Sequence, residues 1–165
     1  ALEAMRAVTV ARIQGHCVGG GVVLAAGCDM RVAGHSARFS IPEVALGIPL
    51  AWGGIPRLVR EVGAPAARDL VMTCRTVESA EAQRLGLVQR VVPDEELDAA
   101  VDDLVAELLD RPGLPMYQTK RAIDAVTSQM VGTDRAFADA DALVSAIGDE
   151  ESREHARRYL ESMGR

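Results

Sequence analysis

The first half of the chain alternates between strand-like and helix-like hydrophobic patterns. Residues 8–13 read Val-Thr-Val-Ala-Arg-Ile, in which β-branched residues alternate with others and predict a strand. Shorter segments of the same kind predict strands over 30–33, 37–40 and 88–92. Between the first two strands, the apolar run over 22–26 predicts a short buried helix. We therefore expect an α/β body whose strands alternate with helices.

From residue 94 onward the hydrophobic period becomes helical. One apolar face is formed by Leu97, Val101, Leu104, Val105 and Leu108. Further helices are predicted over 52–63, 65–74, 80–85, 116–130, 134–147 and 150–163, and Ser79 is the expected N-cap of the third of these. The pattern predicts an α/β body at residues 1–93 and a helical region at residues 94–165.

The composition excludes several classes of protein. The chain has 165 residues, enough for one domain with a real core, and its net charge of −6 argues against a nucleic-acid partner. Its three cysteines, Cys17, Cys28 and Cys74, have no CxxC spacing, so we expect free thiols in a reducing, cytoplasmic compartment. No apolar run approaches the ~20 residues of a membrane span. No group of His, Cys and Asp has zinc spacing, so no metal is expected.

Glu43 is the only ionisable side chain between Arg38 and Arg57, in an almost wholly apolar segment. A buried carboxylate pays for desolvation with a raised pKa, which is the condition of a proton-transfer group. The alternative is a glutamate that points outward from an edge turn beside Pro42. The sequence around Glu43 alone does not decide between the two.

A triple glycine, Gly19 to Gly21, stands between the first strand and the following helix. Glycines let a ligand approach the backbone, and the free amides at a helix start favour anions. The spacing does not match the GxGxxG fingerprint of dinucleotide-binding folds. The alternative is that the glycines only allow tight packing of the helix on the sheet.

Four segments together resemble the crotonase family, the enoyl-CoA hydratase/isomerase superfamily. They are Gln-Gly-His-Cys-Val-Gly-Gly-Gly-Val-Val-Leu-Ala-Ala-Gly-Cys-Asp at 14–29, Ala-Arg-Phe-Ser-Ile-Pro-Glu at 37–43, Trp-Gly-Gly-Ile-Pro-Arg-Leu at 52–58, and Ser-Ala-Glu-Ala…Leu-Gly-Leu-Val…Val-Pro at 79–93. The resemblance implies a β-β-α spiral at 1–93 and a helical oligomerisation region at 94–165, in a homotrimer or hexamer. The family is longer than this chain, which starts at Ala1 without a methionine, so we expect its N-terminal half to be missing here.

The resemblance also implies the chemistry of acyl-CoA thioesters, with CoA as part of the substrate and no separate cofactor. Gly20 matches one of the two backbone amides of the family's oxyanion hole, and the other would come from the missing half. Hydratases of the family use two glutamates, and their positions fall on Val23 and Glu43. A further acidic position of the family falls near Ala51. Glu43 is thus the one carboxylate at these positions.

One carboxylate suits an isomerase of the Δ3-Δ2 kind, in which a single glutamate moves a proton from C2 to C4. We expect Glu43 and the Gly20 amide to be catalytic, and Gly19, Gly21, Val23, Ala51 and Trp52 to contact the substrate. A lone tryptophan in an apolar run more often belongs to the core, so that is the alternative for Trp52. The alternatives are a hydratase-like enzyme with a non-standard second acid, and a non-catalytic acyl-CoA-binding protein.

Three other residues are assigned structural roles. Asp29 follows a turn and is expected to make structural hydrogen bonds, while Cys17 is expected to be a small buried residue. Lys120 could reach a CoA phosphate, but a solvated helix face is the favoured interpretation.

Overall fold

Two short sheets lie at the centre of the fold. The computed structural model describes residues 2–132, 136 and 138–163; Ala1 and residues 134, 135 and 137 of the helix expected over 134–147 lie outside this part. The first sheet has the order β1-β3-β6 and contains β1 (Val10–Ile13), β3 (Met30–Gly34) and β6 (Arg90–Val92). All its strands are parallel, with Val10 opposite Met30 and Val32 opposite Arg90.

The second sheet has the order β2-β4-β5. It contains β2 (His16–Val18), β4 (Arg38–Ser40) and β5 (Val77–Glu78). Strand β2 is parallel to β4, with Cys17 opposite Phe39, and β5 is antiparallel to β4. The sequence did not predict β2 or β5, because strands of two or three residues carry too little periodicity to be recognised.

The first four strands and the first two α-helices form two successive β-β-α units. The helices of the body are α1 (Gly20–Ala26), α2 (Gly54–Thr73) and α3 (Ser79–Arg84), preceded by the 3-10 turn η1 (Leu2–Ala4). The order β1-β2-α1 repeats as β3-β4-α2, and each element of the second unit lies beside its counterpart in the first. The stacked units place the two β–α connections, which carry the candidate site, on the same part of the molecule.

The core lies between the sheets and the helices of the body. Its most deeply buried side chains include Val22, Phe39, Leu58, Val77 and Val88. A smaller cluster joins β3 to the C-terminal region through Val32, Leu97 and Leu104. Leu97 and Leu104 belong to the helical stripe predicted from the sequence, and their burial confirms the inward side of that stripe.

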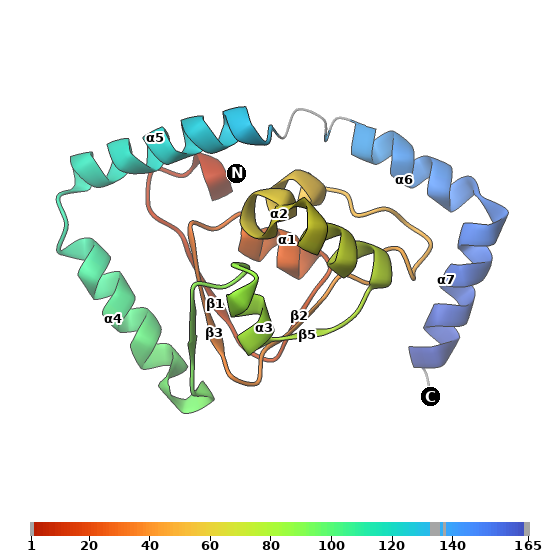
Figure 1. Ribbon diagram of the computed structural model, residues 1–165, viewed down its shortest axis with the longest axis horizontal. Helices are drawn as coiled ribbons and strands as arrows, with labels where there is room; N and C mark the ends of the chain where they lie inside the picture. The colour runs from red at the N-terminus through yellow and green to blue at the C-terminus, as the bar shows by residue number, and fades with distance from the viewer. Residues whose placement is uncertain (1, 133–135, 137, 164–165) are drawn as a thin grey trace.

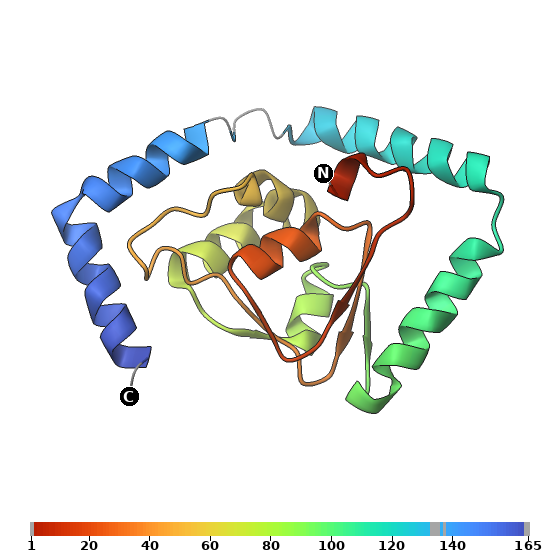
Figure 2. The same cartoon turned by 180° about the vertical axis from the view of Figure 1, so that it is seen from behind.

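Four C-terminal helices run around the α/β body as an arc (Figures 1 and 2). After the 3-10 turn η2 (Asp94–Glu96) they are α4 (Leu97–Leu109), α5 (Gly113–Met130), α6 (Asp139–Gly148) and α7 (Glu150–Met163). Several large apolar side chains on them are exposed: Leu109, Leu114, Ile123, Val126, Met130, Val144, Ile147, Leu160 and Met163. A role of this region in assembly stays a prediction. None of the helices in the described part combines the length and the hydrophobicity needed to cross a membrane.

Lys120 attaches α5 to the body, and its predicted place on a solvated helix face is wrong. Its side chain is 7% exposed, and Nζ donates to Asp29 Oδ2 at 2.7 Å and to the Ala7 carbonyl at 3.0 Å. The same Asp29 oxygen accepts the backbone amide and the hydroxyl of Thr9. The predicted structural role of Asp29 is confirmed, because it joins three segments.

One helix prediction is confirmed and one needs correction. The helices expected over 52–63 and 65–74 are the two halves of α2, which are separated by a kink at Gly63, where φ is 74° and ψ is 161°. Ser79 does not cap α3, since it is the first helical residue and follows the N-cap Glu78. Its hydroxyl instead donates to the His35 carbonyl at 2.9 Å. A tertiary contact with a residue remote in sequence has replaced the local cap.

Arg31 connects four parts of the body from a fully buried position. Its guanidinium donates to the carbonyls of Leu87 at 2.7 Å, Cys28 at 2.7 Å and Ala25 at 3.2 Å, and it pairs with Glu61. The side chain is 2% exposed. A buried charge of this kind is tolerated because every direction of the guanidinium meets an acceptor.

Replacing Arg31 should therefore destabilise the fold strongly. We expect Arg31→Met to lower the free energy of unfolding by about 3–5 kcal/mol, because it leaves Glu61 and buried carbonyls without their partner. Arg12→Met is the matched control: its ion pair with Asp98 is largely exposed, and such pairs contribute about 0–1 kcal/mol. Urea denaturation measures both. Equal losses in the two variants would contradict the role assigned to Arg31.

Candidate active site

Glu43 lies against the triple glycine. It stands in the loop that joins β4 to α2, directly after Ile41 and Pro42, which are both buried. A Cβ atom placed on Gly19 would clash with Glu43 Oε1, so only glycine allows the carboxylate to come this close. Gly19 also has a positive φ of 52°, and its amide donates to the Ser40 carbonyl at 2.8 Å. The side chain of Glu43 thus points toward the glycines rather than outward from the turn.

The carboxylate of Glu43 is poorly solvated. Within the described residues, its Oε2 atom is buried and has no hydrogen-bond partner. Burial raises the pKa of Glu43, and a hydrogen bond from its own backbone amide offsets part of this effect. A carboxylate of raised pKa holds a proton more tightly than an ordinary glutamate, which suits a group that accepts and returns a proton.

Gly20 begins α1 beside this carboxylate. Because it is the first helical residue, its N–H has no acceptor inside the helix. The other side of Gly20 faces Trp52: a Cβ on Gly20 would lie 2.6 Å from Cζ3 of the indole. The two loop residues therefore lie against consecutive glycines, Glu43 against Gly19 and Trp52 against Gly20. The Gly20 amide belongs to the peptide that joins these two glycines.

Trp52 is a surface residue with an unusual backbone. Its side chain is 70% exposed, so the interpretation as a core tryptophan is wrong. Its φ of 59° lies in the left-handed region, which bulky residues rarely adopt. Nη1 of Arg57 donates to the carbonyls of Trp52 at 2.7 Å and Gly53 at 3.0 Å. A strained backbone held by such bonds is common at functional sites.

The other three residues predicted to contact the substrate are Val23, Ala51 and Gly21. Val23 is 5% exposed and packs in the core, where a Cβ on Gly54 would lie 2.9 Å from its Cγ2. Ala51 is half-buried and its carbonyl accepts the Gly54 amide at 3.0 Å, while Gly21 is exposed at the start of α1. The structure brings Glu43, Gly19, Gly20 and Trp52 together, while Val23, Ala51 and Gly21 lie around them in the roles described. The substrate contacts of all these residues stay predictions.

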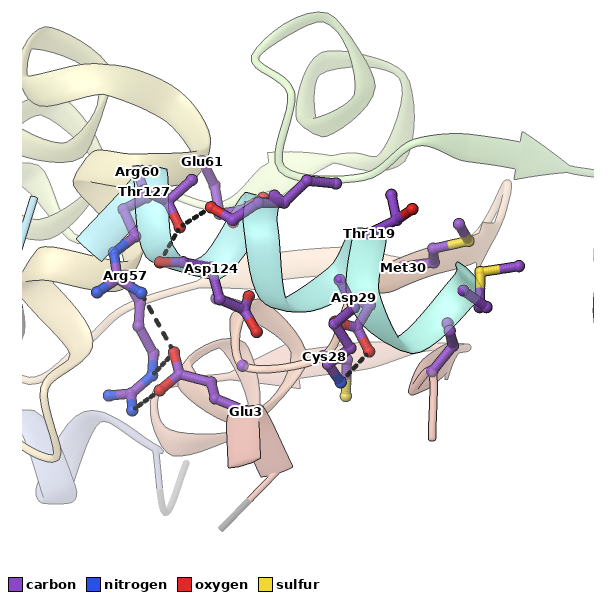
Figure 3. A pocket seen from close by; sticks show the side chains of 16 residues that line it. Glu3, Cys28, Asp29, Met30, Arg57, Arg60, Glu61, Thr119, Asp124 and Thr127 are labelled. Carbon is purple, nitrogen blue, oxygen red and sulfur yellow. Dashed lines mark hydrogen bonds and ion pairs between the residues drawn. The ribbon is translucent and has the colours of Figure 1, made fainter. Parts of the chain in front are cut away.

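A cavity of about 330 Å³ lies elsewhere, between α5 and the body (Figure 3). Its charged lining is largely paired: Glu3 binds Arg57 and Arg60, and Asp29 binds Lys120. Glu43 does not line it. We place the candidate site at Glu43 because an unpartnered carboxylate of raised pKa is a stronger sign of chemistry than an enclosed volume.

The other candidate groups carry no chemistry of their own. Cys17 is buried as predicted, and burial raises the pKa of its thiol to about 11, so it is protonated near neutral pH. In the part of the chain that the structure describes, no three His, Cys, Asp or Glu side chains are grouped to hold a metal ion.

Sequence reasoning missed two residues next to the site. Arg57 holds the Trp52 backbone from α2, and Asp139 of α6 accepts the Gly53 amide at 2.8 Å. Asp139 is 86 residues away from Gly53, and no local pattern could have joined them.

Comparison with known proteins identifies the family to which the chain belongs. A family model described as enoyl-CoA hydratase/isomerase matches residues 1–164. The crotonyl-CoA hydratase of Syntrophomonas wolfei is 36% identical over 97% of this chain and 61% of its own length. An enoyl-CoA hydratase structure from Mycobacterium avium subsp. paratuberculosis superposes with a TM-score of 0.90 at 28% identity, over 97% of this chain and 66% of that one.

Two further solved structures differ in what their names report. A monofunctional enoyl-CoA isomerase of Mycobacterium smegmatis superposes with a TM-score of 0.71 at 30% identity, over 77% of this chain and 60% of that chain. A putative enoyl-CoA hydratase of Thermobifida fusca in complex with acetoacetyl-CoA has a TM-score of 0.74 at 36% identity, over 89% and 57%. The chain spans roughly three fifths of the length of these proteins. It belongs to the enoyl-CoA hydratase/isomerase family.

Proposed function

We propose that this chain forms part of an acyl-CoA isomerase site in which Glu43 is the only proton-transferring carboxylate. The observation that carries the proposal combines two features: a half-buried Glu43 whose Oε2 atom is buried without a partner among the described residues, and an apolar residue at the family's second acid position. That position falls on Val23, whose side chain is packed in the core. A hydrocarbon side chain there can neither donate a proton nor orient a water molecule.

The proposed reaction moves a double bond from C3 to C2 of the acyl chain. Glu43 removes a proton from C2, next to the thioester, and the electron pair moves onto the carbonyl oxygen to give an enolate. The protonated Glu43 then returns the proton to C4 as the double bond shifts. One group serves first as base and then as acid. The reaction therefore needs no second carboxylate and consumes no water.

The enolate oxygen needs preorganised donors, and the Gly20 N–H is the proposed donor in this chain. It begins a helix and has no acceptor within it. Loss of one donor of an oxyanion hole typically lowers the rate by about 10²–10³. The second donor would come from the portion of the relatives' length that this chain does not span.

The environment of Glu43 suits the proposed role. A base must be ionised at working pH yet strong enough to take a proton from carbon, and burial moves the pKa of Glu43 in that direction. The exposed indole of Trp52, next to Gly20, provides an apolar wall for an acyl chain. The complex of the Thermobifida fusca protein with acetoacetyl-CoA supports a CoA thioester as the ligand.

Hydration of a 2-enoyl-CoA is the second candidate, because several relatives are named as hydratases. That reaction adds water across the double bond and uses a second acid in the family pattern. With Val23 in the core, such an acid would have to come from another position. We therefore rank hydration below isomerisation.

Replacement of Glu43 tests the proposed reaction. Glu43→Gln should lower kcat for conversion of a 3-enoyl-CoA to the 2-enoyl-CoA by at least about 10²-fold, because the amide cannot accept the proton. Calorimetry should show CoA-ester binding retained. Glu95→Gln, at an exposed position, is the control and should leave both unchanged.

Each other outcome has a distinct meaning. Efficient hydration of a 2-enoyl-CoA with little isomerisation would contradict the isomerase proposal. Binding of acyl-CoA without either reaction would indicate a binding protein in which Glu43 has no catalytic role.

The raised pKa of Glu43 also predicts a pH-dependent change in stability. Between the ordinary and the raised pKa, the folded protein keeps a proton that the unfolded chain has released, so stability falls as pH rises through this window. Glu43→Gln lacks this effect. The free energy of unfolding of the variant, relative to the unmodified protein, should therefore increase as pH rises from the ordinary pKa of a glutamate, about 4, to the raised pKa of Glu43, and level off above it.

Urea denaturation at several pH values measures this difference. The same comparison for Glu95→Gln should stay flat, because that side chain is exposed. A difference for Glu43→Gln that is constant or declines with pH would show that burial does not raise the pKa of this group.

A further inference from the structure

The C-terminal helices contact the loop that carries Glu43 and Trp52 at two points. At the end of the loop, Asp139 Oδ2 of α6 accepts the Gly53 amide at 2.8 Å. Near its middle, the backbone of α7 lies over Gly47: a Cβ there would clash with the Ser152 carbonyl. Figures 1 and 2 show α6 and α7 beside this loop, on the side of the body away from α4. The loop is thus held by a region that follows it by almost a hundred residues.

The contact at Gly53 acts on a strained segment. Gly53 is buried and left-handed, with φ of 65° and ψ of 26°, and it follows Trp52 with φ of 59°. Consecutive left-handed residues reverse the chain sharply, and for tryptophan this conformation is maintained only where its surroundings impose it. The bonds made by the peptides of Trp52 and Gly53 therefore decide where the indole lies.

Two groups impose this conformation from opposite sides. Arg57 binds the carbonyls of Trp52 and Gly53, and Glu3 holds the guanidinium of Arg57 through two bonds of 3.0 and 2.9 Å (Figure 3). Asp139 binds the amide between those two carbonyls. The pair of peptides is thus held on its oxygen side by the body and on its nitrogen side by α6.

We propose that Asp139 is a positioning residue that acts through the Gly53 amide to keep the Trp52 indole against Gly20. Without this acceptor, the peptide before Gly53 is free to rotate toward an ordinary conformation, and the indole leaves the start of α1. The helical region then sets the width of the site at the glycines, besides any part it takes in assembly. The effect of this width on the binding of an acyl chain rests on the proposed function. The effect of Asp139 on the position of Trp52 does not.

A purely structural role of Asp139 predicts something different. An acidic residue in the first turn stabilises a helix through its dipole, and Asp141 occupies the same turn of α6 with an exposed side chain. If only the charge mattered, the two residues would be equivalent. The bond to Gly53 distinguishes Asp139, so Asp141→Ala is the matched control.

Trp52 is the only tryptophan of the chain, and its fluorescence reports the position of the loop directly. In time-resolved anisotropy, Asp139→Ala should raise the amplitude of the fast indole motion by at least about twofold. Asp141→Ala should leave the amplitude unchanged. Asp139→Asn, which keeps an acceptor oxygen, should restore most of the original value. No residue of α6 is buried, so the body should stay folded in all three variants.

The outcomes separate this proposal from the proposed function. An unchanged amplitude in Asp139→Ala, an equal rise in Asp141→Ala, or no recovery in Asp139→Asn would overturn the positioning role, whatever the activity. If the amplitude changes as expected, an active protein should also show KM for the acyl-CoA raised by about tenfold in Asp139→Ala, with a smaller change in kcat. A protein without any acyl-CoA turnover would refute the proposed function and leave the positioning role supported.

Discussion

The approach of the Glu43 carboxylate to Gly19 is the constraint on which the rest of the site depends. It requires a residue without a side chain at position 19, a positive φ there, and a loop that brings an acid into apolar surroundings. The same approach leaves one carboxylate oxygen buried without a partner in the described part of the chain and raises the pKa of the group. The cost of desolvation raises the proton affinity of this carboxylate, and the surrounding scaffold must offset that cost.

The scaffold meets this requirement by stacking two β-β-α units. Parallel pairing of β1 with β3 and of β2 with β4 fixes the start of α1 beside the β4–α2 loop. Buried charges then join the layers, since Arg31 reaches carbonyls and Glu61 around it, and Lys120 ties α5 to Asp29. The C-terminal helices add the bond from Asp139 to Gly53, so the loop is supported from both sides. Local strain at Trp52 is maintained by Arg57, five residues away, and by two distant residues: Glu3, which holds Arg57, and Asp139.

The sequence predicted the parts of the fold that periodicity encodes. Local patterns of apolar and polar residues predicted the strands β1, β3 and β4 and the helices α1 and α4. They also drew attention to Glu43, the one ionisable residue in an apolar segment. The short strands β2 and β5 did not, because their few residues are strands only through their neighbours. Lys120 and Ser79 were misread for a related reason: each is itself buried and bonds a partner, Asp29 or the His35 carbonyl, that is remote in sequence. Asp139 could not be found at all, because its role depends on a single amide far upstream.

The most direct test of the account is solvent exchange at the carbon next to the thioester. Incubated in D2O with a saturated acyl-CoA, the purified protein should exchange the C2 protons for deuterium, as followed by NMR. The rate should rise with pH as Glu43 loses its proton, and Glu43→Gln should lower it by at least about 10²-fold. This step needs only the base and the oxyanion donors, so it does not depend on whether isomerisation or hydration follows. Exchange that proceeds equally in Glu43→Gln would contradict the central claim that this carboxylate moves the proton.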